Sequence, residues 1–97
     1  MKTLSIFGRR WYRRRIGGTY CTAEIAVDGV TIHKTVEQYG YGDHYLDIVG
    51  DWLEKNGYLS DREHHENGSK EALWRYCERK GIAFEYRAVD VSRERDI

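Results

Sequence analysis

Apolar and polar residues alternate most regularly on the two sides of Asp28-Gly29. Nearly every second position is apolar before and after this dipeptide, and the apolar set is Cys21, Ala23, Ile25, Val27, Val30, Ile32 and Val36. Asp-Gly between two alternating runs is typical of a type I′ turn that joins two strands. The register that follows from a two-residue loop is Val27–Val30, Ile25–Ile32, Ala23–Lys34 and Cys21–Val36. This hairpin would have one aliphatic face, and the other face would carry Thr22, Glu24, His33 and Thr35.

The segment from Thr3 to Ile16 predicts a further strand, joined to the hairpin by Gly17-Gly18. Leu4 and Ile6 share one face, but the alternation breaks around Gly8. A glycine inside a strand often marks a bulge, which exchanges the two faces from that point onward. The pattern therefore leaves open whether Trp11 or Tyr12 points into the core.

Helical spacing begins after the bend at residues 39–42. From Asp43, a good N-cap, apolar residues recur every three or four positions as far as Asn56-Gly57, where a Schellman-type end is expected. After a polar loop over 60–68, Ser69 is expected to cap a second helix that ends at Gly81. Residues 82–91 alternate again and predict a last strand, and residues 92–97 are expected to fray.

These elements predict a single small α+β domain over residues 1–97, in the order β-β-β-α-α-β. The apolar stripes fit an antiparallel sheet with two helices packed on one face and the other face open. The open face would present Thr22, Glu24, His33 and Thr35 beside alternate arginines of the first strand.

Composition narrows the class of protein. The 97 residues are enough for one domain, and 40% of them are hydrophobic, so the chain can build a small core. No apolar run approaches the roughly 20 residues of a membrane span, and the N-terminus lacks the apolar stretch of a signal peptide. With Cys21 and Cys77 at apolar positions and no export signal, we expect a soluble, cytoplasmic protein with free thiols and no membrane contact.

The zero net charge conceals a gradient along the chain. Residues 1–18 contain six basic and no acidic residues, whereas residues 19–68 contain ten acidic residues and three basic ones. The chain is therefore expected to have faces of different charge, and where the charges lie matters more than the net charge of zero.

The basic end contains RRWYRRR, that is Arg9, Arg10, Trp11, Tyr12, Arg13, Arg14 and Arg15. Guanidinium groups bind phosphates and aromatic rings stack on bases, so this run suits contact with nucleic acid or with an acidic partner. The alternative is a solvated strand whose arginines pair with acids and protect a sheet edge. A second candidate is the YGYG turn, where Tyr39 and Tyr41 either cover the core edge or form an aromatic contact patch. His33, on the predicted open face, completes the candidate binding residues.

Catalytic and metal-binding patterns are missing. There is no G-x-S-x-G, P-loop, dinucleotide fingerprint or HExxH motif. Asp43, His44 and Asp47 cluster at a helix start, but capping and the helix dipole explain the two acids. Adjacent His64 and His65 do not have zinc-ligand spacing. We expect neither an enzyme nor a bound metal or cofactor.

The stretches GRRWYRRRIGGTYCTAEIAVDG and QYGYGDHYLD resemble a group of small proteins encoded by phages, prophages and plasmids. The resemblance covers about residues 8–59, departs from the pattern at Cys21, where histidine is expected, and carries no activity or catalytic residues. It implies a non-enzymatic accessory protein of a mobile element that binds, and inhibits or modulates, a host protein or nucleoprotein complex of host defence, as anti-CRISPR proteins do. The alternative is a nucleic-acid-binding module that uses the arginine-rich strand.

Overall fold

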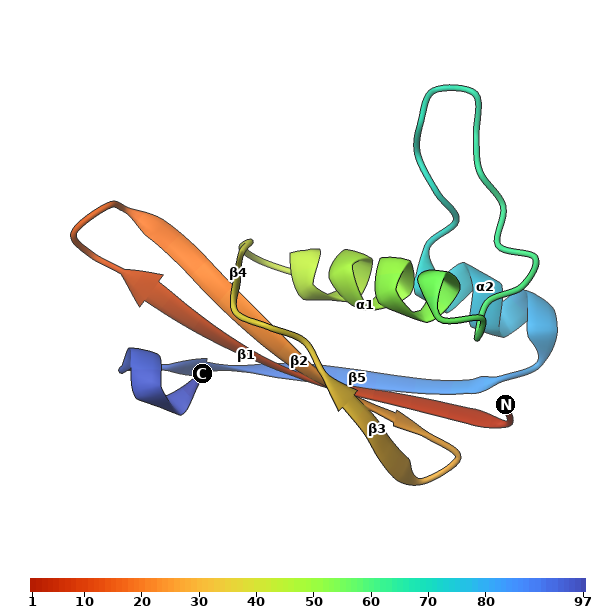
Figure 1. Cartoon of the computed structure of the whole chain (residues 1–97), viewed down its shortest axis with the longest axis horizontal. Coiled ribbons are helices and arrows are strands. Elements are labelled where there is room, and N and C mark those ends of the chain that lie inside the picture. Colours follow the sequence, from red (N-terminus) through yellow and green to blue (C-terminus); the bar gives the residue numbers. More distant parts are fainter.

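Two long strands, β1 and β2, form the centre of a five-stranded mixed sheet, and two helices pack against one of its faces (Figure 1). The computed structural model describes residues 1–97. The elements are β1 (Thr3–Arg13), β2 (Gly18–Val27), β3 (Val30–Lys34), β4 (Gln38–Tyr39), α1 (His44–Lys55), α2 (Leu73–Lys80), β5 (Ala83–Val91) and a final 3-10 turn, Glu94–Asp96. This confirms a small α+β domain with both helices on one face. Neither helix is of a length and hydropathy that would let it cross a bilayer.

The buried core lies between the sheet and the two helices. The sheet contributes alternate residues of β1 and β2, and α1, α2 and the chain between them contribute the rest of the set: Leu4, Ile6, Cys21, Ala23, Ile25, Tyr45, Val49, Leu53, Leu59, Leu73, Tyr76 and Cys77. Burial of this apolar surface is the main force that holds the layers together.

The sheet is mixed, whereas the sequence pattern predicted an antiparallel one. The strand order is β3-β2-β1-β5, with β4 also paired to β2. β5 runs parallel to β1, in an unbroken register from Thr3–Ala83 to Trp11–Val91. The crossover through both helices returns the chain in the direction of β1, and alternation within a strand carries no information on that direction.

The Asp28-Gly29 turn is confirmed, but the predicted hairpin register fails beyond it. Both turn residues have positive φ, 51° and 82°, as a type I′ turn requires. Val27 pairs with Val30 as predicted, and then a bulge shifts the register so that Ile25 lies opposite His33. A bulge exchanges the two faces of β3. As a result Thr35 is buried and Val36 is 72% exposed, which reverses the prediction for these two residues.

β1, in contrast, has no bulge at Gly8, because its pairing with β2 is continuous from Leu4 to Arg13. The glycine has another role: a Cβ at this position would lie 2.8 Å from the ring of Tyr45. The break in alternation thus marks the site where α1 approaches the sheet.

α1 ends as predicted, whereas α2 begins later than predicted. At the end of α1 the Tyr58 amide donates to the Leu53 carbonyl at 2.9 Å and Gly57 has φ 84°, which is a Schellman motif. Asp43 occupies the N-cap position of α1 without a side-chain capping hydrogen bond. The N-cap of α2 is Ala72 and not Ser69. The Ser69 hydroxyl instead donates a hydrogen bond to the Asn67 side chain within the preceding loop. In the tail, Glu94–Asp96 form a 3-10 turn where fraying was expected.

Candidate functional site

The candidate binding residues of β1 divide between the two faces of the sheet. Because β1 alternates without a break, Arg9, Trp11 and Arg13 share the face that points away from the helices, which we call the open face. Arg10 and Tyr12 point to the helix side. The strand ends at Arg13, so Arg14 and Arg15 lie in the exposed turn that follows.

Arginines and aromatic rings interleave on the open face. The ring of Phe7 lies between two guanidinium groups, those of Arg9 at 4.6 Å and Arg87 at 4.8 Å. Further along β1, the Arg13 guanidinium lies 5.8 Å from the Trp11 ring, within the range of a cation–π contact. Each of these three arginines therefore lies against an aromatic ring on the open face.

Two of the five arginines already have carboxylate partners. Arg9 binds Glu24 at 2.8 Å on the open face. On the helix side Arg10 binds Asp90 at 2.9 Å and also donates to the Gly42 carbonyl. Arg10 therefore ties β1 to β5 and to the start of α1, which is a structural role.

The other three arginines, Arg13, Arg14 and Arg15, make no ion pair and are exposed; we call them the arginine tip. They lie where the β1–β2 hairpin projects past the N-terminal end of α1 (Figure 1). A hollow of about 570 Å³ at this end is lined by Trp11, Tyr12, Arg13, Arg14, Arg15, Val91 and Ser92. Aromatic side chains thus adjoin uncompensated positive charge at one end of the molecule.

Tyr39 extends this row of aromatic rings, whereas the ring of Tyr41 stacks on none of them. Tyr39, on β4, pairs with Tyr20 of β2, and their rings meet edge to face at 5.8 Å. Tyr20 in turn lies 6.3 Å from Trp11, so three aromatic rings follow one another beside the arginine tip. Tyr41 is 72% exposed.

His33 does not belong to this surface, although the sequence placed it on the open face. The bulge in β3 turns it to the helix side, where its ring stacks on Trp52 of α1 at 4.2 Å. The contact is part of the packing between β3 and α1.

A groove between α1, α2 and β5 was not anticipated from the sequence. Its volume is about 660 Å³. The residues that line this aromatic groove are Tyr39, Gly40, Tyr41, Asp43, His44, Leu46, Asp47, Ala72, Leu73, Trp74, Phe84 and Tyr86. Trp74 and Tyr86 are 57% and 51% exposed, although Tyr86 pairs with the buried Ile6 on the helix side of the sheet. The groove only becomes visible once β5 lies beside β1.

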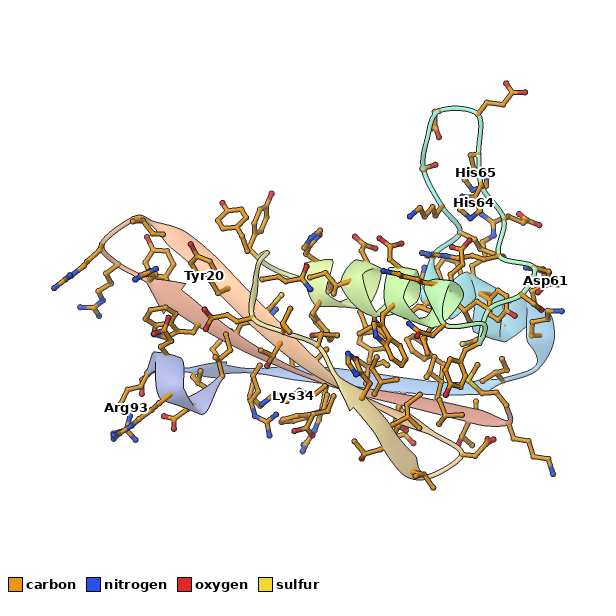
Figure 2. The ribbon with its side chains drawn as sticks, in the orientation of Figure 1. Tyr20, Lys34, Asp61, His64, His65 and Arg93 are labelled. Carbon is orange, nitrogen blue, oxygen red and sulfur yellow. The ribbon has the colours of Figure 1, made fainter.

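The two cysteines are buried, and the adjacent histidines lie in the loop between the helices. Burial raises the pKa of the Cys77 thiol to about 11 and also raises that of Cys21, so both thiols stay protonated and are poor nucleophiles. His64 contacts Glu54, and Figure 2 shows His64 and His65 on the projecting loop after α1, far from Tyr20. No three His, Cys, Asp or Glu side chains come close enough together to hold a metal ion.

Comparison with known proteins adds nothing to this geometry. No family model, curated protein or solved structure matches the chain.

Proposed function

We propose that this chain is a non-enzymatic binding module whose arginine tip docks on an acidic surface of a host protein or nucleoprotein complex. The observation that carries the proposal is the set of three exposed arginines without acidic partners, next to Trp11 and Tyr12, at the projecting end of the hairpin. Arginine beside aromatic rings is typical of the energetically dominant residues in protein interfaces.

The charge distribution favours a protein surface over free nucleic acid. Arg9 and Arg10 are neutralised by Glu24 and Asp90, so of the five arginines in residues 9–15 only the three of the arginine tip remain for phosphates. The chain has no net charge, and the acids of residues 19–68 would repel a long polyanion. The arginine tip alone is enough to bind a compact acidic patch on a folded partner.

The biological setting of the proposal rests on the resemblance of residues 8–59 to proteins of mobile elements. In that setting the chain would bind a host defence or nucleoprotein complex stoichiometrically and inhibit or modulate it, as anti-CRISPR proteins do. Such inhibition needs a specific surface and no reactive group.

Direct binding of nucleic acid is the second candidate. The observation in its favour is the row of Trp11, Tyr20 and Tyr39 rings beside the arginine tip. Single-stranded nucleic acids bind by this combination of stacked rings and positive charge.

Titration of the protein against random single- and double-stranded oligonucleotides distinguishes the two candidates. If the three tip arginines bound phosphates, affinity would fall about 40-fold for duplexes and about 20-fold for single strands between ~50 and ~200 mM salt, because each contact releases counterions. Arg13→Ala or Arg14→Ala would each lower that salt slope by about one unit. Arg75→Ala, in an exposed arginine of α2, is the matched control. We expect weak or no binding at either salt concentration; tight, salt-dependent binding would favour the second candidate.

Capture of the partner from a host lysate tests the leading proposal directly. We expect one partner complex to be retained after nuclease treatment and lost with the Arg13→Glu/Arg14→Glu variant, mostly through faster dissociation. Lys55→Glu, at the far end of α1, should leave capture unchanged. Capture that tolerates charge reversal at the tip would contradict the proposal.

A further inference from the structure

The two edges of the sheet differ in how far they are protected against pairing with another strand. β3, at one edge, has five residues and is bulged. β5, at the other edge, has nine residues, keeps an unbroken register with β1 and pairs with no other strand. Long, regular edge strands readily accept a further strand. Of the features that usually guard such edges, β5 lacks bulges and proline and has only the charged side chains of Glu85, Arg87 and Asp90.

The hydrogen-bonding groups of β5 that point outward can be assigned from one contact. The Ala83 amide donates to the Lys2 carbonyl, at the start of β1, at 2.9 Å. Groups alternate in direction along a strand, so the odd-numbered amides of β5 point to β1. The amides and carbonyls of Phe84, Tyr86 and Ala88 point away from the sheet and are free for a new strand.

We propose that a second copy of this chain adds to this edge, with the two β5 strands antiparallel about a two-fold axis at Tyr86. In this register Tyr86 pairs with Tyr86 of the partner subunit, and the free groups of both strands meet. Glu85 then lies opposite Arg87 of the partner subunit, and the same pair repeats across the axis. An isologous contact of this kind is the commonest basis of a dimer.

Charge complementarity selects this register. Both Glu85 and Arg87 are exposed on the open face, and neither makes an ion pair within the chain. An axis one residue later would place Arg87 opposite itself, and an axis one residue earlier would place Glu85 opposite itself. Like charges directly opposite each other destabilise a ladder, whereas opposite charges stabilise it.

The exposed apolar surface of β5 fits the same arrangement. Tyr86 is 51% exposed at the mouth of the aromatic groove, and Val89 is 38% exposed on the open face. Tyr86 of the partner subunit would lie beside Tyr86 on the helix side, so both rings lose contact with water. The result is one continuous sheet with the helices of both copies on the same face.

Sedimentation equilibrium tests the proposal through charge reversal and its rescue. We expect the unmodified chain to be a dimer, Glu85→Arg and Arg87→Glu each to weaken it at least tenfold, and the double variant to restore it, because opposite charges face each other again. Glu66→Arg, at the loop tip, and Lys55→Glu are matched controls that should stay dimeric. A monomer at hundreds of micromolar overturns the proposal and leaves the edge to a strand of another protein; a double variant without rescue overturns the register.

Cross-linking tests the register even where charge reversal impairs folding. The Cα atoms of a hydrogen-bonded antiparallel pair lie ~5.5 Å apart, within the range that a disulfide spans. Tyr86→Cys should therefore form a covalent dimer under mild oxidation. Val89→Cys, which lies away from its own symmetry mate in this register, should not. Equal cross-linking of the two variants, or none with Tyr86→Cys, contradicts the proposal.

Discussion

Gly8 lies at the centre of β1 beneath the ring of Tyr45, which is 2% exposed. The residues beside it in the two neighbouring strands are also small: Gly8 pairs with Ala23 on β2 and with Ala88 on β5. A row of three small residues thus crosses the sheet and makes a trough for the tyrosine ring. The close approach of α1 to the sheet depends on this trough.

Gly8→Ala should lower the free energy of unfolding by about 1–3 kcal/mol, because the added methyl group would overlap the Tyr45 ring. Urea unfolding measures the loss. Tyr45→Leu in the same background removes the ring, so the double variant should lose less than the sum of the two single variants. Full additivity would contradict the ring contact.

Gly29→Val should lower stability by about 1–3 kcal/mol, because it forces a β-branched residue to φ 82°. A Cβ at Gly29 would meet no atom within 4 Å, so the loss would come from the backbone alone. Gly29→Asn is the matched control and should cost far less, since asparagine tolerates positive φ. An unchanged melting temperature for Gly29→Val would contradict the type I′ turn.

At the scale of elements, the segment between α1 and α2 is held by charged side chains as well as by Leu59. Arg62 is 8% exposed; its guanidinium binds Asp51 at 2.9 Å and donates to the Glu71 carbonyl. Glu71, 2% exposed, accepts two hydrogen bonds from Arg79 of α2 at 2.7 and 3.0 Å. Each buried charge has a partner, which is the condition for burying it at moderate cost.

The free energy of unfolding at acid pH should depend on this segment. Hydrogen bonds from Lys80, Tyr76 and Arg79 hold the pKa of Asp61 at about 2, and Arg79 lowers that of Glu71. A lowered carboxyl pKa in the folded state stabilises the fold above the unfolded pKa, and this contribution is lost as pH falls through the folded value. Unfolding free energy should therefore fall between about pH 4 and pH 2. Asp61→Asn should flatten that fall, and Glu66→Gln should leave it unchanged; equal slopes in all three proteins would contradict this role.

At the scale of the whole molecule, local patterns predicted most of the elements and the pairing at the Asp28-Gly29 turn, but not the direction of β5 or the register of β3 beyond the turn. The hairpin turn, both helix C-termini and the last strand follow from periodicity and from glycine at positive φ. The direction of β5 depends on contacts about 80 residues apart in sequence, and the burial of Thr35 depends on a bulge that alternation does not encode. The candidate site, too, was predictable from the sequence only in part. Alternation predicted that alternate arginines of the first strand share a face, but it left the direction of Trp11 open. The pairing of Arg10 with Asp90 and the aromatic groove both require β5 in place.

The position of β5 also sets an order of events during synthesis. The ribosome releases the N-terminus first, so β1 and β2 emerge early and can pair as a local hairpin. Their neighbour β5 ends at Val91, so residues 28–91 must also leave the exit tunnel before β1 gains its second partner. Such long-range closure is slow compared with hairpin formation. Until it occurs, β1 offers an unpaired edge to chaperones and to neighbouring nascent chains.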